Sequence, residues 1–186
     1  MRVIDTDLPG LRIIEPTVHE DSRGFFMESY NYRDYAKCGL DDIYLQDNHS
    51  LSGPGTLRGL HYQLPPGQAK LVRVVVGAVY DVAVDIRRGS PTYGLWRGFW
   101  LSAENKRQLY LPTGYAHGFC VVSERAEFLY KVTGYYDPEL ERGIAWDDPD
   151  LAIAWPVAEP LLSPRDRQHP RLRDAENTWA FAKTGS

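Results

Sequence analysis

The feature that most constrains the fold is a close succession of short strand-like segments, separated by turn sequences, between residues 57 and 136. Turns such as Arg88-Gly89-Ser90-Pro91 and Pro112-Thr113-Gly114 divide segments that are rich in valine and aromatic residues. Many short strands at near-regular spacing are typical of a β-sandwich or a β-barrel. We therefore predict an all-β fold with strands at 57–63, 71–76, 78–86, 94–101, 108–111, 118–122 and 127–136.

The N-terminal part of the chain continues this pattern with one interruption. Residues 32–37 have room for one or two helical turns, and Gly39 is a natural C-terminal stop for them. Short strands are predicted on both sides, two within 1–20 and one each at 25–30 and 43–48.

The C-terminal tail is irregular, because prolines stand at positions 156, 160, 164 and 170. No internal repeat or low-complexity linker divides the chain. We therefore expect one domain over 1–186, with a jelly-roll core at about 20–140 and an irregular C-terminal segment at about 147–186. Any helices are expected to be short and peripheral.

Composition excludes several classes of protein. The chain has 186 residues, of which 43% are hydrophobic, enough for one domain with a sizeable core. A net charge of −4 argues against a general nucleic-acid-binding protein, although a local cluster of arginine and lysine can still hold an anionic ligand. The N-terminus lacks an apolar signal core, and no apolar run approaches membrane-spanning length. We expect a cytoplasmic protein with no nucleic-acid or membrane partner.

The predicted strand 57–63 carries an unusual face. Side chains alternate along a strand, so Leu57, Gly59, His61 and Gln63 share one side. The glycine leaves open space beside His61, and Gln63 adds a polar neighbour. This face suits a pocket that contains a base, and it also suits a histidine that is hydrogen-bonded within a sheet.

The spacing of the histidines argues against a metal centre. Histidines occur at 19, 49, 61, 117 and 169. A metal-binding barrel of the cupin type would place a second histidine two residues after His61, on the same strand face, and that position is Gln63. We therefore expect neither a metal nor a cofactor.

A metal-free site would use His61 as a base. A neutral imidazole accepts a proton at physiological pH when a carboxylate orients it, and the candidates are Asp81, Asp85 and Asp166. Tyr130 shares a strand face with Phe128 and could return a proton, and Lys70 could stabilise negative charge on oxygen. Each has a plainer interpretation, because tyrosines often fill cores and most lysines are solvated.

Several ordered segments together resemble one known family, the dTDP-4-dehydrorhamnose 3,5-epimerases. The likeness extends over about residues 1–170. The segments that carry it are Arg23-Gly24-Phe25-Phe26, Gln46-Asp47-Asn48-His49-Ser50, Gly59-Leu60-His61-Tyr62-Gln63, 68–73, 81–87, Ala116-His117-Gly118-Phe119 and 127–131.

The resemblance implies a cupin-type jelly-roll β-barrel, a homodimer without cofactor, and a dTDP-4-keto-6-deoxyhexose substrate. It implies that His61 is the base, Tyr130 the acid, Asp166 the carboxylate that orients the histidine, and Lys70 the cation near the keto oxygen. Arg165 stands where many members have a lysine. The positions that match contacts to the nucleotide sugar are Arg23, Glu28, Gln46, Asp47, Asn48, Arg58, Lys70, His117, Tyr136, Glu141 and Arg165.

Two features of the strand pattern bear on these assignments. Tyr135 and Tyr136 are adjacent, and alternation with Phe128 favours Tyr136 as the aromatic that stacks on thymine. Arg58 and His61 have opposite parity, although both are expected to meet the ligand. A bulge near Gly59, or an arginine that reaches around the strand edge, would reconcile them.

The alternative functions that we consider differ in chemistry. One keeps the substrate and inverts C3 or C5 alone, as relatives in antibiotic-sugar pathways do. Another is a sugar-nucleotide-binding barrel without catalysis, in which His61, Tyr130 and Lys70 are structural. The last is a metal-dependent cupin oxygenase.

Overall fold

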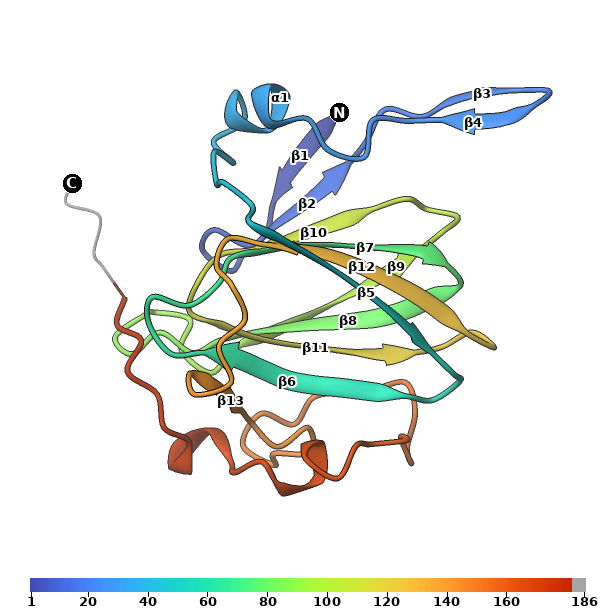
Figure 1. The fold of residues 1–186 in the computed structure, drawn as a ribbon. Helices are drawn as coiled ribbons and strands as arrows, with labels where there is room; N and C mark the ends of the chain where they lie inside the picture. The colour runs from blue at the N-terminus through green and yellow to red at the C-terminus, as the bar shows by residue number, and fades with distance from the viewer. Residues whose placement is uncertain (182–186) are drawn as a thin grey trace.

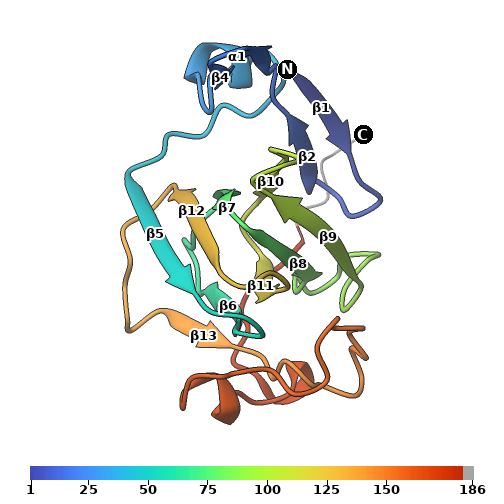
Figure 2. The same ribbon diagram turned by 90° about the vertical axis from the view of Figure 1, so that its right-hand side faces the viewer.

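The computed structural model describes residues 1–181, and its core is two antiparallel β-sheets that face each other (Figures 1 and 2). The larger sheet has the order β1-β2-β10-β7-β12-β5, and the smaller sheet has the order β13-β6-β11-β8-β9. The predicted all-β jelly-roll fold is confirmed. The strands are β1 (Arg2–Asp5), β2 (Arg12–Glu15), β3 (His19–Asp21), β4 (Gly24–Phe26), β5 (Gln46–Ser52), β6 (Leu57–Gln63), β7 (Lys70–Val76), β8 (Ala78–Asp85), β9 (Trp96–Ser102), β10 (Gln108–Leu111), β11 (Tyr115–Val121), β12 (Ala126–Val132) and β13 (Glu141–Gly143).

The main hydrophobic core lies between the two sheets. Its centre is a stacked pair of rings, Phe128 of β12 and Phe119 of β11, with centroids 4.2 Å apart. Aliphatic side chains from both sheets surround this pair, among them Val72 and Val79, which are fully buried. Burial of this apolar surface is the largest favourable term in holding the sheets together.

Strand β8 shows why both faces of the smaller sheet are buried. Ala83 faces the main core, whereas Val82 and Val84 belong to a second apolar cluster on the opposite face. The C-terminal segment supplies Leu151 and Leu172 to that cluster and lies below the smaller sheet in Figure 1. Side chains therefore alternate between the two faces of β8, and the C-terminal segment covers the outer face of the smaller sheet.

Short helices and a hairpin surround the sheets. Helix α1 (Tyr32–Ala36) begins at Asn31, whose side chain accepts a hydrogen bond from the backbone N–H of Arg33, and two 3₁₀ turns, η1 (Asp166–Gln168) and η2 (Leu172–Asp174), lie in the C-terminal segment. The hairpin β3–β4 projects from the body of the molecule, and all its strand residues are exposed (Figure 1). No helix within residues 1–181 is long and apolar enough to cross a membrane.

Some predicted boundaries differ from the structure. Strand β4 ends at Phe26, short of the predicted residue 30. The predicted strand 127–136 ends at Val132, because Val132 is the last residue that pairs with both neighbours, Gln46 of β5 and Lys70 of β7. The sheets also extend beyond 20–140, since β2 pairs with β10 and β13 pairs with β6. Residues 182–186 of the predicted C-terminal segment lie outside the described residues.

A register shift between β6 and β11 places Arg58 and His61 on the same face. His61 pairs with His117, whereas Arg58 pairs with Phe119, so one extra residue of β6 is accommodated between the two pairs. Gly59 makes this possible because its φ is +132° and a Cβ there would lie only 2.5 Å from the Cα of Gly118. The predicted bulge near Gly59 is confirmed, and the parity conflict disappears.

Candidate active site

A cavity of about 110 Å³ lies between the sheets at the end where β6 leaves the barrel. Strands β5, β7 and β12 of the larger sheet and β6 and β13 of the smaller sheet all contribute side chains to it. Most of the lining residues are polar, which is unusual for the interior of a small barrel. They are Gln46, Asn48, His61, Tyr62, Gln63, Gln68, Lys70, Tyr130, Tyr136 and Glu141.

His61 is oriented by Asp166, a carboxylate 105 residues further along the chain. His61 Nε2 and Asp166 Oδ1 are 2.6 Å apart. The Ser163 hydroxyl donates a second hydrogen bond to Asp166 Oδ2 at 2.8 Å. Burial opposes ionisation of Asp166, but the neighbouring His169 and His61 outweigh it and hold the pKa of this carboxyl well below its usual value.

This hydrogen bond determines which nitrogen of His61 can act as a base. The carboxylate of Asp166 accepts the proton on Nε2, so the neutral imidazole keeps its lone pair on Nδ1. The side chain of His61 is 29% exposed and lines the cavity. An oriented and accessible imidazole of this kind is suited to remove a proton from a bound molecule.

The other two carboxylates considered from the sequence serve different partners. Asp81 is fully buried and accepts hydrogen bonds from His117 Nε2 at 3.0 and 2.9 Å. Asp85 accepts from Arg87, Ser90 and Thr92. Only Asp166 is therefore the partner of His61.

Tyr130 and Lys70 enter the cavity from the larger sheet, whereas His61 enters it from the smaller sheet. Burial raises the pKa of Tyr130, so its hydroxyl keeps its proton and can donate it. Burial lowers the pKa of Lys70 to about 8, although the nearby Glu141 and Asp81 carboxylates act in the opposite direction. A base and an acid thus face the same space from opposite walls, with a cation beside them.

A second histidine–aspartate pair lies beneath the cavity. His117 of β11 is the cross-strand partner of His61, and its side chain is only 8% exposed. Burial lowers the pKa of His117 and raises that of Asp81, while the charge of each partner acts in the opposite direction on the other. His117 is not a lining residue, so its predicted contact with the substrate remains a prediction.

Charged and aromatic groups meet beside the cavity. The Tyr136 hydroxyl and Arg165 Nη1 both donate to Glu141 Oε2 at 2.5 Å. Burial works against ionisation of Glu141, but these two hydrogen bonds outweigh it and lower its pKa. Tyr136 lines the cavity, whereas Tyr135 is 72% exposed, and stacking of Tyr136 on thymine remains a prediction. The parity argument for it was wrong, because β12 ends before both tyrosines.

Besides His117 and Arg165, four predicted contact residues do not line this cavity in the single chain. Arg58 lies on the same strand face as His61 but is exposed, and its Nε donates to Ser52 Oγ at 3.0 Å. Arg23 pairs with Asp21 in the β3–β4 hairpin, and Glu28 accepts from Asn31 Nδ2 at 3.2 Å. The fourth residue, Asp47, is described next.

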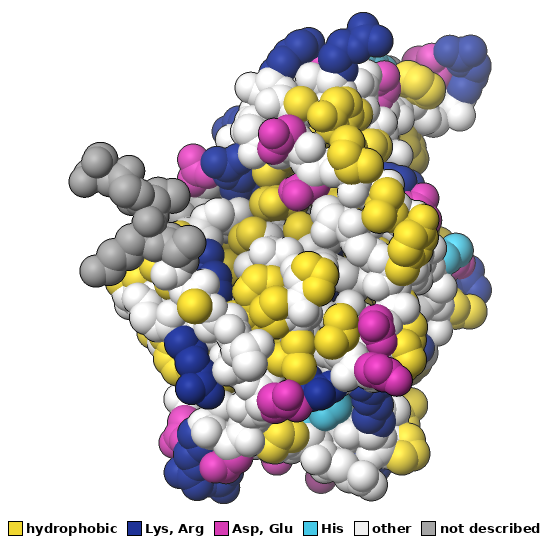
Figure 3. Space-filling view, turned by 60° about the vertical axis from the view of Figure 1, so that its left-hand side comes forward, with side chains coloured by type: hydrophobic (Ala, Val, Ile, Leu, Met, Phe, Trp, Pro, Cys, Tyr) yellow, Lys and Arg dark blue, Asp and Glu magenta, His cyan; other side chains and the backbone are white. Residues whose placement is uncertain are grey.

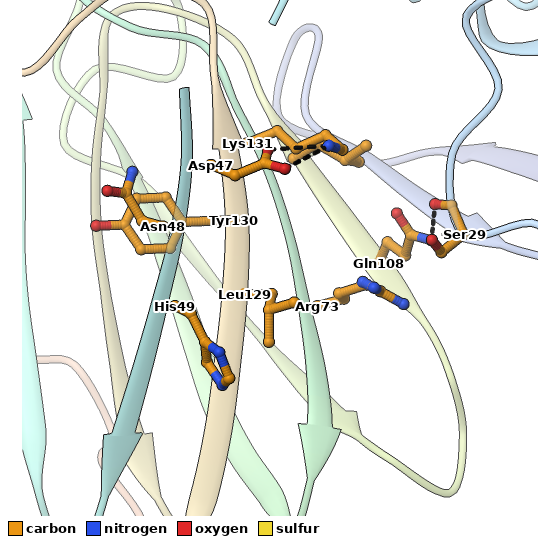
Figure 4. Close-up of a pocket in the computed structure, with 10 residues that line it drawn as sticks. Ser29, Asp47, Asn48, His49, Arg73, Gln108, Leu129, Tyr130 and Lys131 are labelled. Carbon is orange, nitrogen blue, oxygen red and sulfur yellow. Dashed lines mark hydrogen bonds and ion pairs between the residues drawn. The ribbon is translucent and has the colours of Figure 1, made fainter. Parts of the chain in front are cut away.

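Asp47 lies in a different pocket, on the outer face of the larger sheet. It pairs with Lys131 Nζ at 2.9 Å, and Figure 4 shows the two side chains together. This outer pocket has a volume of about 340 Å³ and also holds Arg73 and Gln108. Tyr130 lines both pockets, but the histidine of the outer pocket, His49, is 55% exposed and pairs with Glu127, whereas His61 is held by the buried Asp166. The inner cavity is therefore the better candidate for catalysis.

His169 is the residue near the site that the sequence analysis missed. Its Nε2 lies 3.5 Å from Asp166 Oδ1, and its ring meets that of His61 edge to face with centroids 5.5 Å apart. His61, Asp166 and His169 are the one group within residues 1–181 whose possible metal-ligating atoms all lie within 4.8 Å of one another. The spacing of three residues between Asp166 and His169 was the only signal in the sequence. Gln63, where a cupin metal site would have a histidine, instead donates to the Asp137 carbonyl at 3.2 Å.

Comparison with known proteins gives a consistent result over nearly the whole chain. A family model described as dTDP-4-dehydrorhamnose 3,5-epimerase matches residues 5–174. The protein of that name from Pseudomonas aeruginosa is 54% identical over 178 residues, which are 95% of this chain and 98% of the relative. A protein from Streptomyces niveus named dTDP-4-dehydrorhamnose 3-epimerase is 44% identical over 95% of this chain and 86% of its own length.

The fold is also similar to a solved structure that contains a ligand. The crystal structure of the 3,5-epimerase from Legionella pneumophila in complex with dTDP-4-keto-L-rhamnose superposes with a TM-score of 0.90 and 52% sequence identity. The match covers 92% of this chain and 93% of that protein.

The Asp166 carboxylate makes a pH-dependent contribution to stability. Its pKa is lowered in the folded state, so the contribution is present above the unfolded value of about 3.9 and is lost as the pH falls toward the folded value. Asp166→Asn should lower the free energy of unfolding by roughly 3 kcal/mol at pH 7. The variant should then lose less stability than the wild type when the pH falls from 5 to 3. Urea unfolding at pH 7 and between pH 5 and 3 measures both changes in the free energy of unfolding. Ser163→Ala should give a smaller change in the same direction, and parallel curves for wild type and Asp166→Asn would contradict the assignment.

Proposed function

Because the chain belongs to the dTDP-4-dehydrorhamnose 3,5-epimerase family, we propose that it inverts C3 and C5 of dTDP-4-dehydro-6-deoxy-D-glucose to give dTDP-4-dehydro-L-rhamnose. The chain is accordingly an isomerase. The observation that carries the detailed mechanism is that His61 and Tyr130 reach one cavity from facing sheets, with Lys70 beside them.

The chemistry begins with a carbon acid. A C–H bond beside a ketone is acidic because the charge left by proton removal spreads onto the keto oxygen. His61 Nδ1 removes this proton, and Asp166 stabilises the imidazolium that forms. The Lys70 ammonium stabilises the negative oxygen of the enolate. No metal or organic cofactor enters this route, because side chains supply the base, the acid and the positive charge.

Inversion follows from the two-walled cavity. Tyr130 lies on the sheet opposite His61, so a proton that it donates arrives on the other face of the planar enolate. Removal from one face and return to the other inverts the carbon. The same pair acts twice, once at C5 and once at C3, if the sugar presents both carbons to it in turn and exchange with water returns His61 to its neutral form and Tyr130 to its protonated form in between.

The remainder of the substrate lies outside the cavity. Pockets that enclose a ligand of drug size have volumes of about 300–1,000 Å³, whereas this cavity has about 110 Å³ and suits a part of the nucleotide sugar. The amides of Gln46 and Asn48 can hydrogen-bond the sugar. Arg165 and Tyr136, which share Glu141, stand where a diphosphate and a thymine ring can pack beside the opening.

A single-carbon epimerase is the second candidate. The relative from Streptomyces niveus is named as a 3-epimerase and matches almost the whole chain. The same base and acid serve either outcome, and the position of the bound sugar decides which carbons reach them. Product analysis by NMR separates the two functions.

A homodimer would complete the site. The β3–β4 hairpin extends away from its own cavity and carries Arg23 at its tip and Phe26 with 69% of its surface exposed (Figure 1). Leu51 of the edge strand β5 is 62% exposed, and Figure 3 shows further apolar side chains across the middle of one face of the molecule. Apolar patches of this kind mark interaction surfaces. In our proposal the hairpin of one chain brings Arg23 and Glu28 to the substrate bound by the other.

The base and the acid have separable effects. His61→Asn should abolish both deuterium exchange from heavy water into the keto sugar and formation of product, a loss of roughly 10²–10⁴-fold. Tyr130→Phe should keep some exchange while impairing inversion. NMR of the sugar at C3 and C5 measures both deuterium exchange and inversion, and binding of thymidine diphosphate serves as the folding control. Exchange at the wild-type rate in His61→Asn would remove it as the base, and a wild type that binds without exchange would favour a binding barrel.

The Lys70 ammonium predicts the alkaline limb of the pH profile. It is protonated below its pKa of about 8, so kcat/KM should fall as the pH rises through that value. Lys70→Met should lower kcat by roughly 10²–10³-fold and remove this limb. Steady-state kinetics between pH 6 and 10 measure this pH dependence of kcat/KM. If Lys70→Met keeps the alkaline limb, the limb belongs to another group.

Mixed dimers test the exchanged hairpin. Chains with Arg23→Ala or with His61→Asn should each be impaired alone. When the two are co-expressed with different tags, they should regain about one quarter of wild-type activity, because half of the dimers are mixed and each mixed dimer has one intact site. Sedimentation should report twice the chain mass. If isolated mixed dimers regain no activity, the hairpin of one chain does not contribute to the substrate site of the other.

A further inference from the structure

Three possible metal ligands converge on the wall behind His61. His61 Nε2 is 2.6 Å from Asp166 Oδ1, and His169 Nε2 approaches the same oxygen to 3.5 Å from another direction. The three ligand atoms all lie within 4.8 Å of one another. Two imidazole nitrogens are therefore directed at one carboxylate oxygen.

His169 Nε2 faces the Asp166 carboxylate but is not hydrogen-bonded. This nitrogen is buried and makes no hydrogen bond within residues 1–181, and the side chain is only 9% exposed. Buried polar atoms are nearly always satisfied, so an unpaired one calls for an explanation. The ring is also held firmly, because a Cβ at Gly143 would lie 2.3 Å from it. The nitrogen is thus packed in place 3.5 Å from the Asp166 carboxylate, without a hydrogen bond that satisfies it.

We propose that His61, Asp166 and His169 form an inhibitory site for Zn²⁺. Two imidazoles and one carboxylate form a donor set that Zn²⁺ accepts in three-ligand sites with one open position. Zinc ligands at about 2.0–2.2 Å in tetrahedral geometry lie about 3.3 Å from one another, close to the 3.5 Å between His169 and Asp166. The closer His61–Asp166 pair opens by less than about 1 Å when the ion takes the place of the shared proton. A cavity of about 250 Å³ lined by His169 and Arg165 provides an entry path.

Inhibition follows from the tautomer of His61, and this step rests on the proposed function. The neutral imidazole carries one ring proton, on Nε2. A Zn²⁺ ion on Nε2 needs the lone pair of that nitrogen, so the proton moves to Nδ1. Nδ1 then has no lone pair with which to remove a proton from the sugar. The metal also withdraws Asp166 from its hydrogen bond.

Calorimetric titration of metal-free protein with Zn²⁺ tests the site without substrate. The wild type should bind one ion per chain, and His169→Gln should weaken this binding roughly tenfold or more. His49→Gln is the matched control, because His49 is an exposed histidine whose Nε2 is 3.0 Å from Glu127. It should bind Zn²⁺ as the wild type does. Equal binding by wild type and His169→Gln, or weaker binding by His49→Gln, overturns the proposal.

The epimerase assay tests the consequence. Zn²⁺ should inhibit the wild type reversibly, with activity restored by EDTA, and the inhibitory concentration should rise roughly tenfold or more in His169→Gln, measured against that variant's own metal-free rate. Bound Zn²⁺ without inhibition overturns the inhibitory role. A metal-free enzyme that fails to epimerise defeats the proposed function instead, and calorimetry still decides whether the three ligands bind the ion.

Discussion

The hydrogen bond between His61 and Asp166 is the contact on which the site depends. It joins the interior face of β6 to the turn η1, so the base is correctly oriented only when the C-terminal segment is packed on the smaller sheet. That packing is apolar, through Leu151 and Leu172. A buried carboxylate needs compensation, and Ser163 and two imidazoles supply it here. The tail of the chain is thus a functional part of the barrel.

The jelly-roll architecture solves a stereochemical problem that a single sheet cannot. Residues on one sheet face all approach a ligand from the same side, whereas His61 and Tyr130 stand on sheets that face each other. The stacked Phe119 and Phe128 rings occupy the interior beside them and keep the sheets at a fixed separation. Acid and base therefore keep their spacing because the apolar core sets it.

Local patterns in the sequence predicted much of this, and long-range pairing explains what they could not. Turn residues and the close spacing of short strands predicted the all-β class, and the resemblance supplied Asp166. Periodicity alone could not choose among three aspartates, because the choice depends on how a tail 105 residues away folds back. Arg58 needed the register shift at Gly59, and the only signal for His169 was its spacing from Asp166, because neither strand nor helix period links it to His61.

The separation of charges explains why the orienting carboxylate stands behind the base and not in the cavity. A carboxylate beside Lys70 would form an ion pair with it, raise its pKa and compete with a developing enolate oxygen. Asp166 instead contacts the far nitrogen of His61, and the carboxylates that act on Lys70 are Glu141, already bonded to Arg165, and Asp81, already bonded to His117. Burial therefore holds the pKa of Lys70 near 8 against the opposing effect of these two carboxylates, and the ammonium is free to meet negative charge that appears only during the reaction. The imidazole transmits the effect of Asp166 to the substrate without placing its charge there.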